Sequence, residues 1–174
     1  MPNRGRAVNA AREAGLPIIV VQHKGFGQDS DDQQLHPVVT RPADDHRIDK
    51  QKPNVFTNTD LADWPQAHRI DTMSSVGYMT HNCNPSTVFE AHHRGLNAEL
   101  LSDATVSLPH ANRAGTTSAK DKRGVFSVVF ESNFAAVLSS AEWLQAIATA
   151  SAPKPENPVA SYRRALIHKL AAAQ

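Results

Sequence analysis

The sequence predicts an α/β domain, because short apolar strand-like runs alternate along the chain with helical segments. Residues 16–21 form a continuous apolar run with four β-branched side chains, which is typical of a strand buried on both faces of a sheet. Residues 98–101 form a second buried run. The 174 residues are enough for one domain with a substantial core. We assign residues 1–152 to this domain and residues 153–174 to a C-terminal tail with a short helix.

Composition limits the classes of partner and compartment. The formal net charge of +1 provides no global field for nucleic acid or a membrane surface, and no apolar run reaches the length of a membrane span. One cysteine cannot form an internal disulfide, so a reducing cytoplasm is the expected location. The only close pair among the nine histidines is His92-His93, whose side chains we expect to point apart on a helix. We therefore predict neither a metal site nor a cofactor.

The first third of the chain is predicted to contain a helix, a strand and a long polar segment. Residues 4–14 suit a helix that ends at Gly15 and Pro17. The strand at 16–21 follows it. Residues 23–52 are polar and unusually long for a connection inside a domain, so they are either a functional loop or a solvated insertion. The inner face of the helix is expected to consist of Ala7, Val8, Ala11 and Ala14.

The middle of the chain is predicted to alternate again. Thr59 suits the N-cap of a short helix over 60–66, and residues 71–78 form a strand whose serines and threonine make it weak on pattern alone. The strand at 98–101 ends at residues 102–104, where we expect Asp103 to act as a local cap or turn acceptor. Residues 108–115 are predicted to be a loop near the carboxyl edge of the sheet.

Two capping signals organise the last third. Ser118 with Asp121 predicts a helix that continues to about residue 130, and residues 133–138 form the last strand. Ser139 with Glu142 predicts a second capped helix, whose inward face contains Trp143, Leu144 and Ile147. Residues 162–170 suit a basic surface helix, for which a solvated face or a subunit contact is favoured over nucleic-acid binding.

The only cysteine lies where the strand at 71–78 gives way to a helix. Asn84 suits the N-cap, Pro85 the first helical position and Gly95 the C-terminal stop. The positive end of a helix dipole favours the thiolate, which is the nucleophilic form of Cys83. A single cysteine is more often a small buried apolar residue. A strand-to-helix turn, however, points its side chains into the crevice at the carboxyl end of the sheet.

The segment Gly77-Tyr78-Met79-Thr80-x-x-Cys83 resembles the nucleophile motif of the isochorismatase-like cysteine hydrolases. The likeness continues over nearly the whole chain. It includes Lys50 six residues before Phe56, then Thr59-x-Leu61, and further segments at 110–115, 134–137 and 142–143. The resemblance implies a three-layer α/β/α domain with a mostly parallel sheet. It also implies a homo-oligomer, for which the tail at 153–174 is a candidate contact.

The resemblance implies a hydrolase that cleaves the C–N bond of a small amide or imide through a thioester on Cys83. Lys50 would be the site lysine, with Lys52 as the less favoured choice by spacing. Oxyanion donors would be the backbone N–H groups of Met79 and Cys83, with a cis peptide bond between Tyr78 and Met79. The substrate itself is not identified by the sequence; the candidates for lining its pocket are Phe56, Tyr78, His23 and Asn82, together with the 23–52 segment.

This chain departs from the family pattern at the catalytic aspartate. The family has it in an Asp-x-Gln motif on a strand just before the first helix, and residues 1–22 contain no aspartate. That strand is central in the family, between the strands predicted at 16–21 and 71–78, so we expect an opening in the sheet. The alternative function is a catalytically impaired relative that binds a small carbonyl compound or a partner chain without turnover. A thiol redox sensor is disfavoured because no second cysteine is present.

Overall fold

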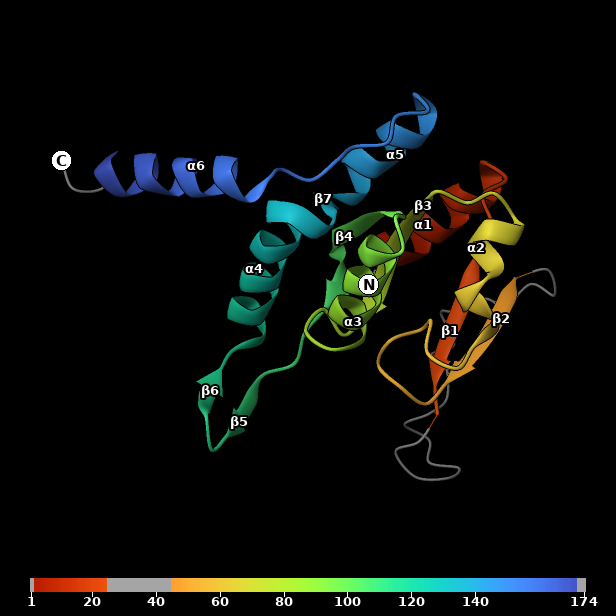
Figure 1. Cartoon of the computed structure of the whole chain (residues 1–174), viewed down its shortest axis with the longest axis horizontal. Helices are drawn as coiled ribbons and strands as arrows, with labels where there is room; N and C mark the ends of the chain where they lie inside the picture. Colours follow the sequence, from red (N-terminus) through yellow and green to blue (C-terminus); the bar gives the residue numbers. More distant parts are fainter. Residues whose placement is uncertain (1, 25–44, 172–174) are drawn as a thin grey trace.

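A computed structural model of the chain describes residues 2–24 and 45–171 (Figure 1). The prediction that residues 23–52 form a loop was wrong at its described ends, because His23 ends one strand and His46–Lys50 form another. Residues 25–44 lie outside the described residues. Parallel strands and helices alternate through the rest of the chain, as predicted.

Helix α1 (Pro2–Glu13) buries Ala7 and Ala11 against the sheet, and Val8 is half-buried. Ala14, which was expected on the inner face, is exposed because the helix has already ended. Gly15 adopts φ 68° and turns the chain, and its N–H donates to the Arg12 carbonyl at 2.9 Å. This left-handed position favours glycine because glycine has no Cβ to clash.

Strands β1 (Ile19–His23) and β2 (His46–Lys50) pair in parallel, with His23 opposite Lys50 at their carboxyl ends. The prediction that the first strand is buried on both faces was wrong: Val21 is 37% exposed. The strand also begins three residues later than predicted, at Ile19. Among the described residues, β1 has a hydrogen-bonded neighbour on only one side, which leaves its other edge less covered.

The second sheet has the order β3-β4-β7 and is also parallel. It consists of β3 (Thr72–Tyr78), β4 (Asn97–Val106) and β7 (Ala136–Leu138). Strand β4 is longer than expected and passes through Asp103, whose Oδ1 accepts hydrogen bonds from the Ser140 N–H at 2.9 Å and its hydroxyl at 2.6 Å. Asp103 therefore accepts at the start of the helix that begins with Ser140, 37 residues further along the chain, and the expectation of a local cap or turn acceptor was wrong.

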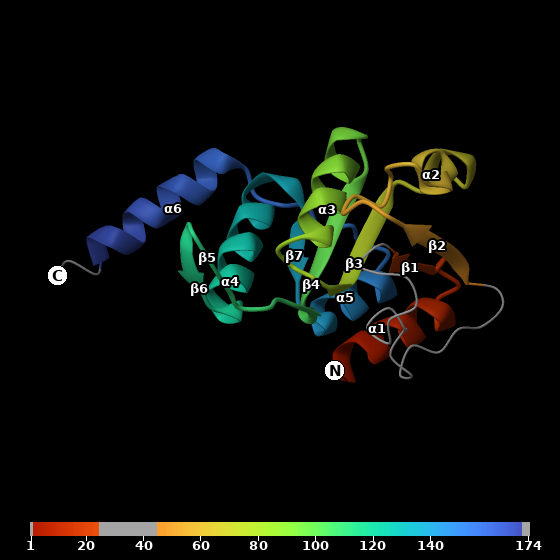
Figure 2. The ribbon, with the colours of Figure 1, turned by 90° about the horizontal axis from the view of Figure 1, so that it is seen from below.

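Helices cover both faces of this sheet, which makes three layers (Figure 2). On one face, α3 (Cys83–His93), α4 (Ala119–Val129) and the π-helical turn η3 (Phe130–Phe134) pack over Leu100. On the other face, α1 and α5 (Ser140–Ala148) pack over Leu101, and α5 buries Trp143. The predicted three-layer α/β/α fold with a mostly parallel sheet is therefore confirmed.

No described strand lies between β1 and β3, so the described residues form two separate parallel sheets. The hydrophobic core nevertheless continues across the opening. Ile48 of β2 belongs to the same cluster as Val88 of α3 and Leu100 of β4, and Ile19 of β1 packs against it. The expected opening is thus present among the described residues, and the adjoining edges of β1 and β3 face one another across it.

Several elements have other bounds than the sequence predicted. The helix expected at 60–66 is divided into a 3₁₀ turn η2 (Asp60–Ala62) and α2 (Trp64–Ala67), and Thr59 Oγ1 caps the first by accepting from the Leu61 N–H at 3.3 Å. The loop expected at 108–115 contains most of an antiparallel hairpin, β5 (His110–Asn112) and β6 (Gly115–Thr117). The last strand begins at Ala136, because the preceding residues form η3.

The two predicted capping signals are confirmed. Ser118 Oγ accepts from the Asp121 N–H at 3.1 Å, and Ser139 with Glu142 forms a complete capping box at α5. The C-terminal helix α6 (Pro158–Ala171) is longer than expected. None of the helices that the structure describes is long and apolar enough to cross a membrane.

Candidate active site

The turn between β3 and α3 places Cys83 at the N-terminus of a helix. Met79 organises this turn: its carbonyl accepts from the N–H groups of Asn82 at 3.2 Å and Asn84 at 3.3 Å. Thr80 N–H donates to the Val106 carbonyl at 2.9 Å, which holds the turn against the end of β4. The peptide bond between Tyr78 and Met79 is cis, as expected.

The helix begins two residues earlier than the sequence suggested. Asn82, not Asn84, occupies the N-cap position, and Cys83 is the first helical residue. Asn84 was expected to cap with its side chain, but it is only 7% exposed and its Oδ1 accepts from Ser75 Oγ on β3 at 3.2 Å. The amide side chain is therefore used to join α3 to the sheet, and the Asn82 side chain makes no capping bond.

Two backbone N–H groups at this turn differ from their neighbours in having no acceptor within residues 2–24 and 45–171. Neither the Met79 N–H nor the Cys83 N–H donates to an acceptor among the described residues, whereas Thr80, Asn82 and Asn84 all do. The Cys83 thiol is free and half-buried. A half-buried thiol beside two available N–H donors at a helix N-terminus can attack a carbonyl carbon and stabilise the resulting oxyanion.

Lys50 lies at the carboxyl end of β2 and is only 5% exposed. Its ammonium group donates to the Lys52 carbonyl at 3.1 Å and to the Pro53 carbonyl. The chain thus wraps around this charge and offers carbonyl dipoles to it, as burial of a cation requires. Lys52 itself is exposed. Of the two lysines that the sequence left open, Lys50 is the buried one.

His23 lies across the parallel ladder from Lys50 and is half-buried. Burial lowers the pKa of His23, and the positive charge of Lys50 lowers this pKa further. The imidazole is therefore neutral at pH 7. The carboxyl ends of β1 and β2 therefore place a neutral imidazole next to the Lys50 side chain.

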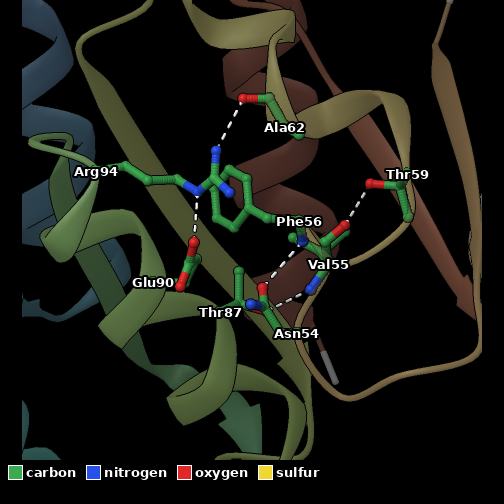
Figure 3. A network of polar contacts seen from close by, with 8 residues as sticks. All are labelled: Asn54, Val55, Phe56, Thr59, Ala62, Thr87, Glu90 and Arg94. Atoms are coloured by element: carbon green, nitrogen blue, oxygen red, sulfur yellow. Dashed lines mark hydrogen bonds and ion pairs between the residues drawn. The ribbon is translucent and has the colours of Figure 1, made fainter.

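A polar network connects the loop after Lys50 to the helix that begins with Cys83 (Figure 3). The Val55 N–H donates to Thr87 Oγ1 of α3 at 3.2 Å, and the Arg94 guanidinium lies over the Phe56 ring, 4.9 Å from its centroid. Arg94 also donates to the Ala62 carbonyl at 3.0 Å. Phe56, one of the predicted pocket residues, is 3% exposed and belongs to the core cluster. The Phe56 ring therefore lies in the hydrophobic core beneath the site.

The other predicted pocket residues lie closer to solvent. Tyr78 is 57% exposed and Asn82 is half-buried at the turn. A hollow of about 510 Å³ adjoins the Lys50 loop. A second hollow, of about 620 Å³, lies between β4 and α4 and includes Asp103. Neither hollow includes Cys83. The residues lining the first are Lys24, Asp49, Gln51, Lys52, Thr57 and Asn58.

A cluster around His81 was not singled out from the sequence. His81 Nδ1 lies 3.2 Å from Ser107 Oγ, and its ring meets that of His110 edge-on with centroids 4.8 Å apart. Lys122 is 8% exposed and donates to the Leu108 carbonyl at 2.7 Å. Burial lowers the pKa of His81, and the nearby Lys122 and His110 lower it further. Burial also lowers the pKa of Lys122. In the sequence, the one feature that could have drawn attention to His81 was its position two residues before Cys83.

No group of three or more His, Cys, Asp or Glu side chains that could hold a metal ion occurs in the described part of the chain. The expectation that His92 and His93 point apart was wrong. Their rings meet edge to face with centroids 5.7 Å apart, because His92 also packs edge-on against Phe134.

Comparisons with known proteins identify the family of this chain. Residues 1–142 match the model of the isochorismatase domain. A crystal structure of a putative isochorismatase from Burkholderia xenovorans LB400 is 44% identical, with a TM-score of 0.93 over 97% of this chain and 84% of that one. An isochorismatase from Pseudomonas putida KT2440 is 29% identical, with a TM-score of 0.76 over 81% of this chain and 75% of that one.

A more distant structure shows the fold alone. It is a cysteine hydrolase from Pseudomonas syringae pv. phaseolicola 1448A, 24% identical, with a TM-score of 0.80 over 86% of this chain and 80% of that one. A comparison with curated proteins gave no match. The extent of the domain match and the identity to the Burkholderia structure establish that this chain belongs to the isochorismatase family of small-molecule hydrolases.

Proposed function

We propose that the protein hydrolyses the C–N bond of a small amide or imide through a thioester on Cys83. The observation that carries this proposal is the position of the half-buried Cys83 thiol at the start of α3, beside the N–H groups of Met79 and Cys83. A covalent nucleophile divides one difficult displacement into two easier ones.

In the first step, the Cys83 thiolate attacks the substrate carbonyl carbon and forms a C–S bond. The carbonyl oxygen becomes an oxyanion that accepts hydrogen bonds from the Met79 and Cys83 N–H groups, each worth on the order of 3 kcal/mol. The C–N bond then breaks, and the nitrogen leaves with one added proton. Water attacks the thioester in the second step, which releases a carboxylic acid and regenerates the thiol.

Lys50 supplies positive charge to the site without acting as a base. Its ammonium donates to the carbonyls of Lys52 and Pro53 and so is fixed in place. A fixed cation near a thiol stabilises the thiolate. It cannot, however, remove a proton from the thiol and later deliver it to the leaving nitrogen, and general acid–base assistance contributes roughly 10²–10⁴-fold to such reactions.

The resemblance assigns this proton transfer to an aspartate on a strand between β1 and β3, where the described residues have none. Without such a carboxylate, Cys83 and Lys50 would form the acyl enzyme more readily than they would release it. The opening between β1 and β3 also supports the second candidate function, which is binding of a small carbonyl compound or partner chain without turnover.

The test is a panel of small amides and imides, followed by mass spectrometry of the intact protein and by product release. An acyl adduct that is absent in Cys83→Ser, with any multiple turnover lost in Lys50→Met but retained in Lys52→Met, is the expected result. Lys52 is the matched control because it is exposed and lies two residues from Lys50. Turnover retained by Cys83→Ser would refute the proposal. Adduct formation without product release would assign the chain to the binding function.

A further inference from the structure

The turn that carries Cys83 contains buried polar atoms that have no hydrogen-bond partner among the described residues. Thr80 is fully buried, and its Oγ1 is one of these atoms. The Nδ2 of the buried Asn84 is another, although its Oδ1 accepts from Ser75. His81 Nε2 is the third. A hydroxyl and an amide nitrogen can both donate, and buried polar groups are normally paired, so the turn calls for an acceptor from outside the described chain.

The end of β4 brings His81 and Lys122 to neighbouring points. Ser107 and Leu108 directly follow this strand. Ser107 Oγ lies 3.2 Å from His81 Nδ1, and the Leu108 carbonyl accepts from Lys122 Nζ at 2.7 Å. Because Ser107 and Leu108 are consecutive residues, they hold an imidazole from the β3–α3 turn close to an ammonium from α4. Burial lowers the pKa of His81, and Lys122 lowers it further, as a nearby cation does.

Lys122 is a buried cation without a counter-charge. It forms no ion pair with a carboxylate in the described parts of the chain. The adjacent Asp121 is exposed, and its Oδ2 accepts from Ser118 Oγ at 2.7 Å. An ammonium has three N–H donors, of which the Leu108 carbonyl takes one. Lys122 also lies in the first turn of α4, where the helix dipole disfavours a cation and favours an anion. The position therefore suits an anionic ligand.

These groups lie at the same edge of the sheet as the nucleophile. The Met79 carbonyl accepts from the N–H groups of the residues on both sides of Cys83, so His81 and Cys83 belong to one compact turn. Helices α3 and α4 both begin at the carboxyl edge of β4 (Figure 1). Small molecules bind to open parallel α/β sheets at this edge. One ligand can therefore meet the thiol with one group and Lys122 with another.

We propose that His81 and Lys122 form a subsite for a carboxylate of the substrate, so that the preferred substrates are small amides that carry a carboxylate, such as half-amides of dicarboxylic acids. This inference rests on the proposed function, because it assigns a second contact to the same substrate. The carboxylate accepts from Lys122 Nζ and supplies the missing counter-charge. In the tautomer whose Nδ1 accepts from the Ser107 hydroxyl, His81 Nε2–H is the second donor. The subsite orients the substrate and takes no part in bond breaking.

A pair of amides tests the subsite through acylation of Cys83. Succinamate has a carboxylate where butyramide has a methyl group. The natural chain is expected to be acylated by succinamate roughly ten- to hundredfold faster at equal low concentration, because hydrogen bonds to charged groups contribute about that factor. The preference is expected to disappear in Lys122→Met, to persist in part in Lys122→Arg and to remain in Lys120→Met. Lys120 is the matched control because it is exposed in the same turn of α4.

Binding of succinate, which has no amide, tests the subsite without any reaction. In a Cys83→Ser background, succinate is expected to raise the pKa of the His81 imidazole, because a nearby carboxylate favours the charged form. Nuclear magnetic resonance follows this titration, and the His81 signal is the one that is absent in His81→Gln. The effect of succinate is expected to be lost in Lys122→Met and kept in Lys120→Met. Far-UV circular dichroism establishes that each variant is folded; if Lys122→Met is not, the titration of His81 decides.

The two measurements separate this inference from the proposed function. Succinate that shifts the His81 titration in a chain that no amide acylates would support the subsite and refute the hydrolase. Equal acylation by succinamate and butyramide, with no effect of succinate on His81, would support the hydrolase and overturn the subsite. The unpaired polar atoms would then be assigned to ordered water. A preference that Lys120→Met and Lys122→Met reduce equally would also overturn the subsite.

Discussion

The Arg94 guanidinium lies over the Phe56 ring, 4.9 Å from its centroid, and so joins the end of the Cys83 helix to the loop that holds Lys50. Arg94 Nε also donates to Glu90 Oε1 at 2.7 Å, and Arg94 Nη1 to the Ala62 carbonyl at 3.0 Å. Cys83 follows β3 and Lys50 ends β2, and these two strands belong to separate sheets in the described structure. Their relative position therefore depends on contacts of this kind.

Replacing Arg94 by alanine is expected to lower the free energy of unfolding by roughly 1–2 kcal/mol. The variant loses a partly exposed cation–π contact and the hydrogen bond to the Ala62 carbonyl. Urea denaturation followed by tryptophan fluorescence measures the change. Arg47→Ala is the control, because Arg47 is exposed on β2. A loss equal to that of the control would show that the contact adds nothing to stability.

Replacing Lys50 by methionine is expected to slow alkylation of Cys83 by iodoacetamide at neutral pH about tenfold, because the variant lacks the cation that we propose acts on the thiol. The methionine fills the space of the lysine stem but removes the charge. Labelling rates are measured by mass spectrometry of the intact protein. Lys52→Met is expected to label at the natural rate. Equal slowing in both variants would show that Lys50 has no specific effect on the reactivity of the Cys83 thiol.

His23 is expected to titrate below its ordinary range in the natural chain and to shift upward in Lys50→Met. Burial remains in that variant, but the charge that also lowers the His23 pKa is gone. A group with a lowered folded-state pKa contributes stability above its unfolded pKa and loses it as pH falls through the folded value. Stability attributed to His23 is thus lost on acidification below about pH 6.5. Nuclear magnetic resonance of the imidazole protons follows the titration, and an unchanged midpoint would exclude coupling to Lys50.

Removing the capping box of α5 is expected to cost about 1 kcal/mol in Ser139→Ala. The Glu142 carboxylate accepts from the Ser139 N–H at 2.7 Å and from its hydroxyl at 2.7 Å, and these bonds lower the Glu142 pKa. The contribution of Glu142 to the free energy of unfolding is therefore complete above the unfolded pKa of a glutamate. It is lost as pH falls through the folded pKa of Glu142. Unfolding free energies of the natural chain and Glu142→Gln are expected to converge in acid. Parallel pH profiles would contradict this.

The sequence by itself determined the elements whose signals are local. Capping residues lie next to the helices they start, so Ser118 and Ser139 were found from a pattern of four residues. The strand-to-helix turn before Cys83 was likewise located from a contiguous stretch, whereas its cis peptide was expected only from the resemblance of Gly77–Cys83 to a family motif. The alternation of buried strands and helices was enough for the α/β class.

Only the tertiary structure decided which side chains these elements bury. Asn84 looked like a cap, but its Oδ1 accepts a hydrogen bond from Ser75 Oγ on β3, and the spacing of the two residues gave no sign of this contact. Val21 looked fully buried, yet burial of a strand requires neighbours on both sides. Lys50 and Lys52 differ by two positions in sequence, and only the fold of residues 50–53 buries one charge against carbonyls while leaving the other in water. Burial and pairing are properties of segments distant in the chain, so a local pattern does not contain them.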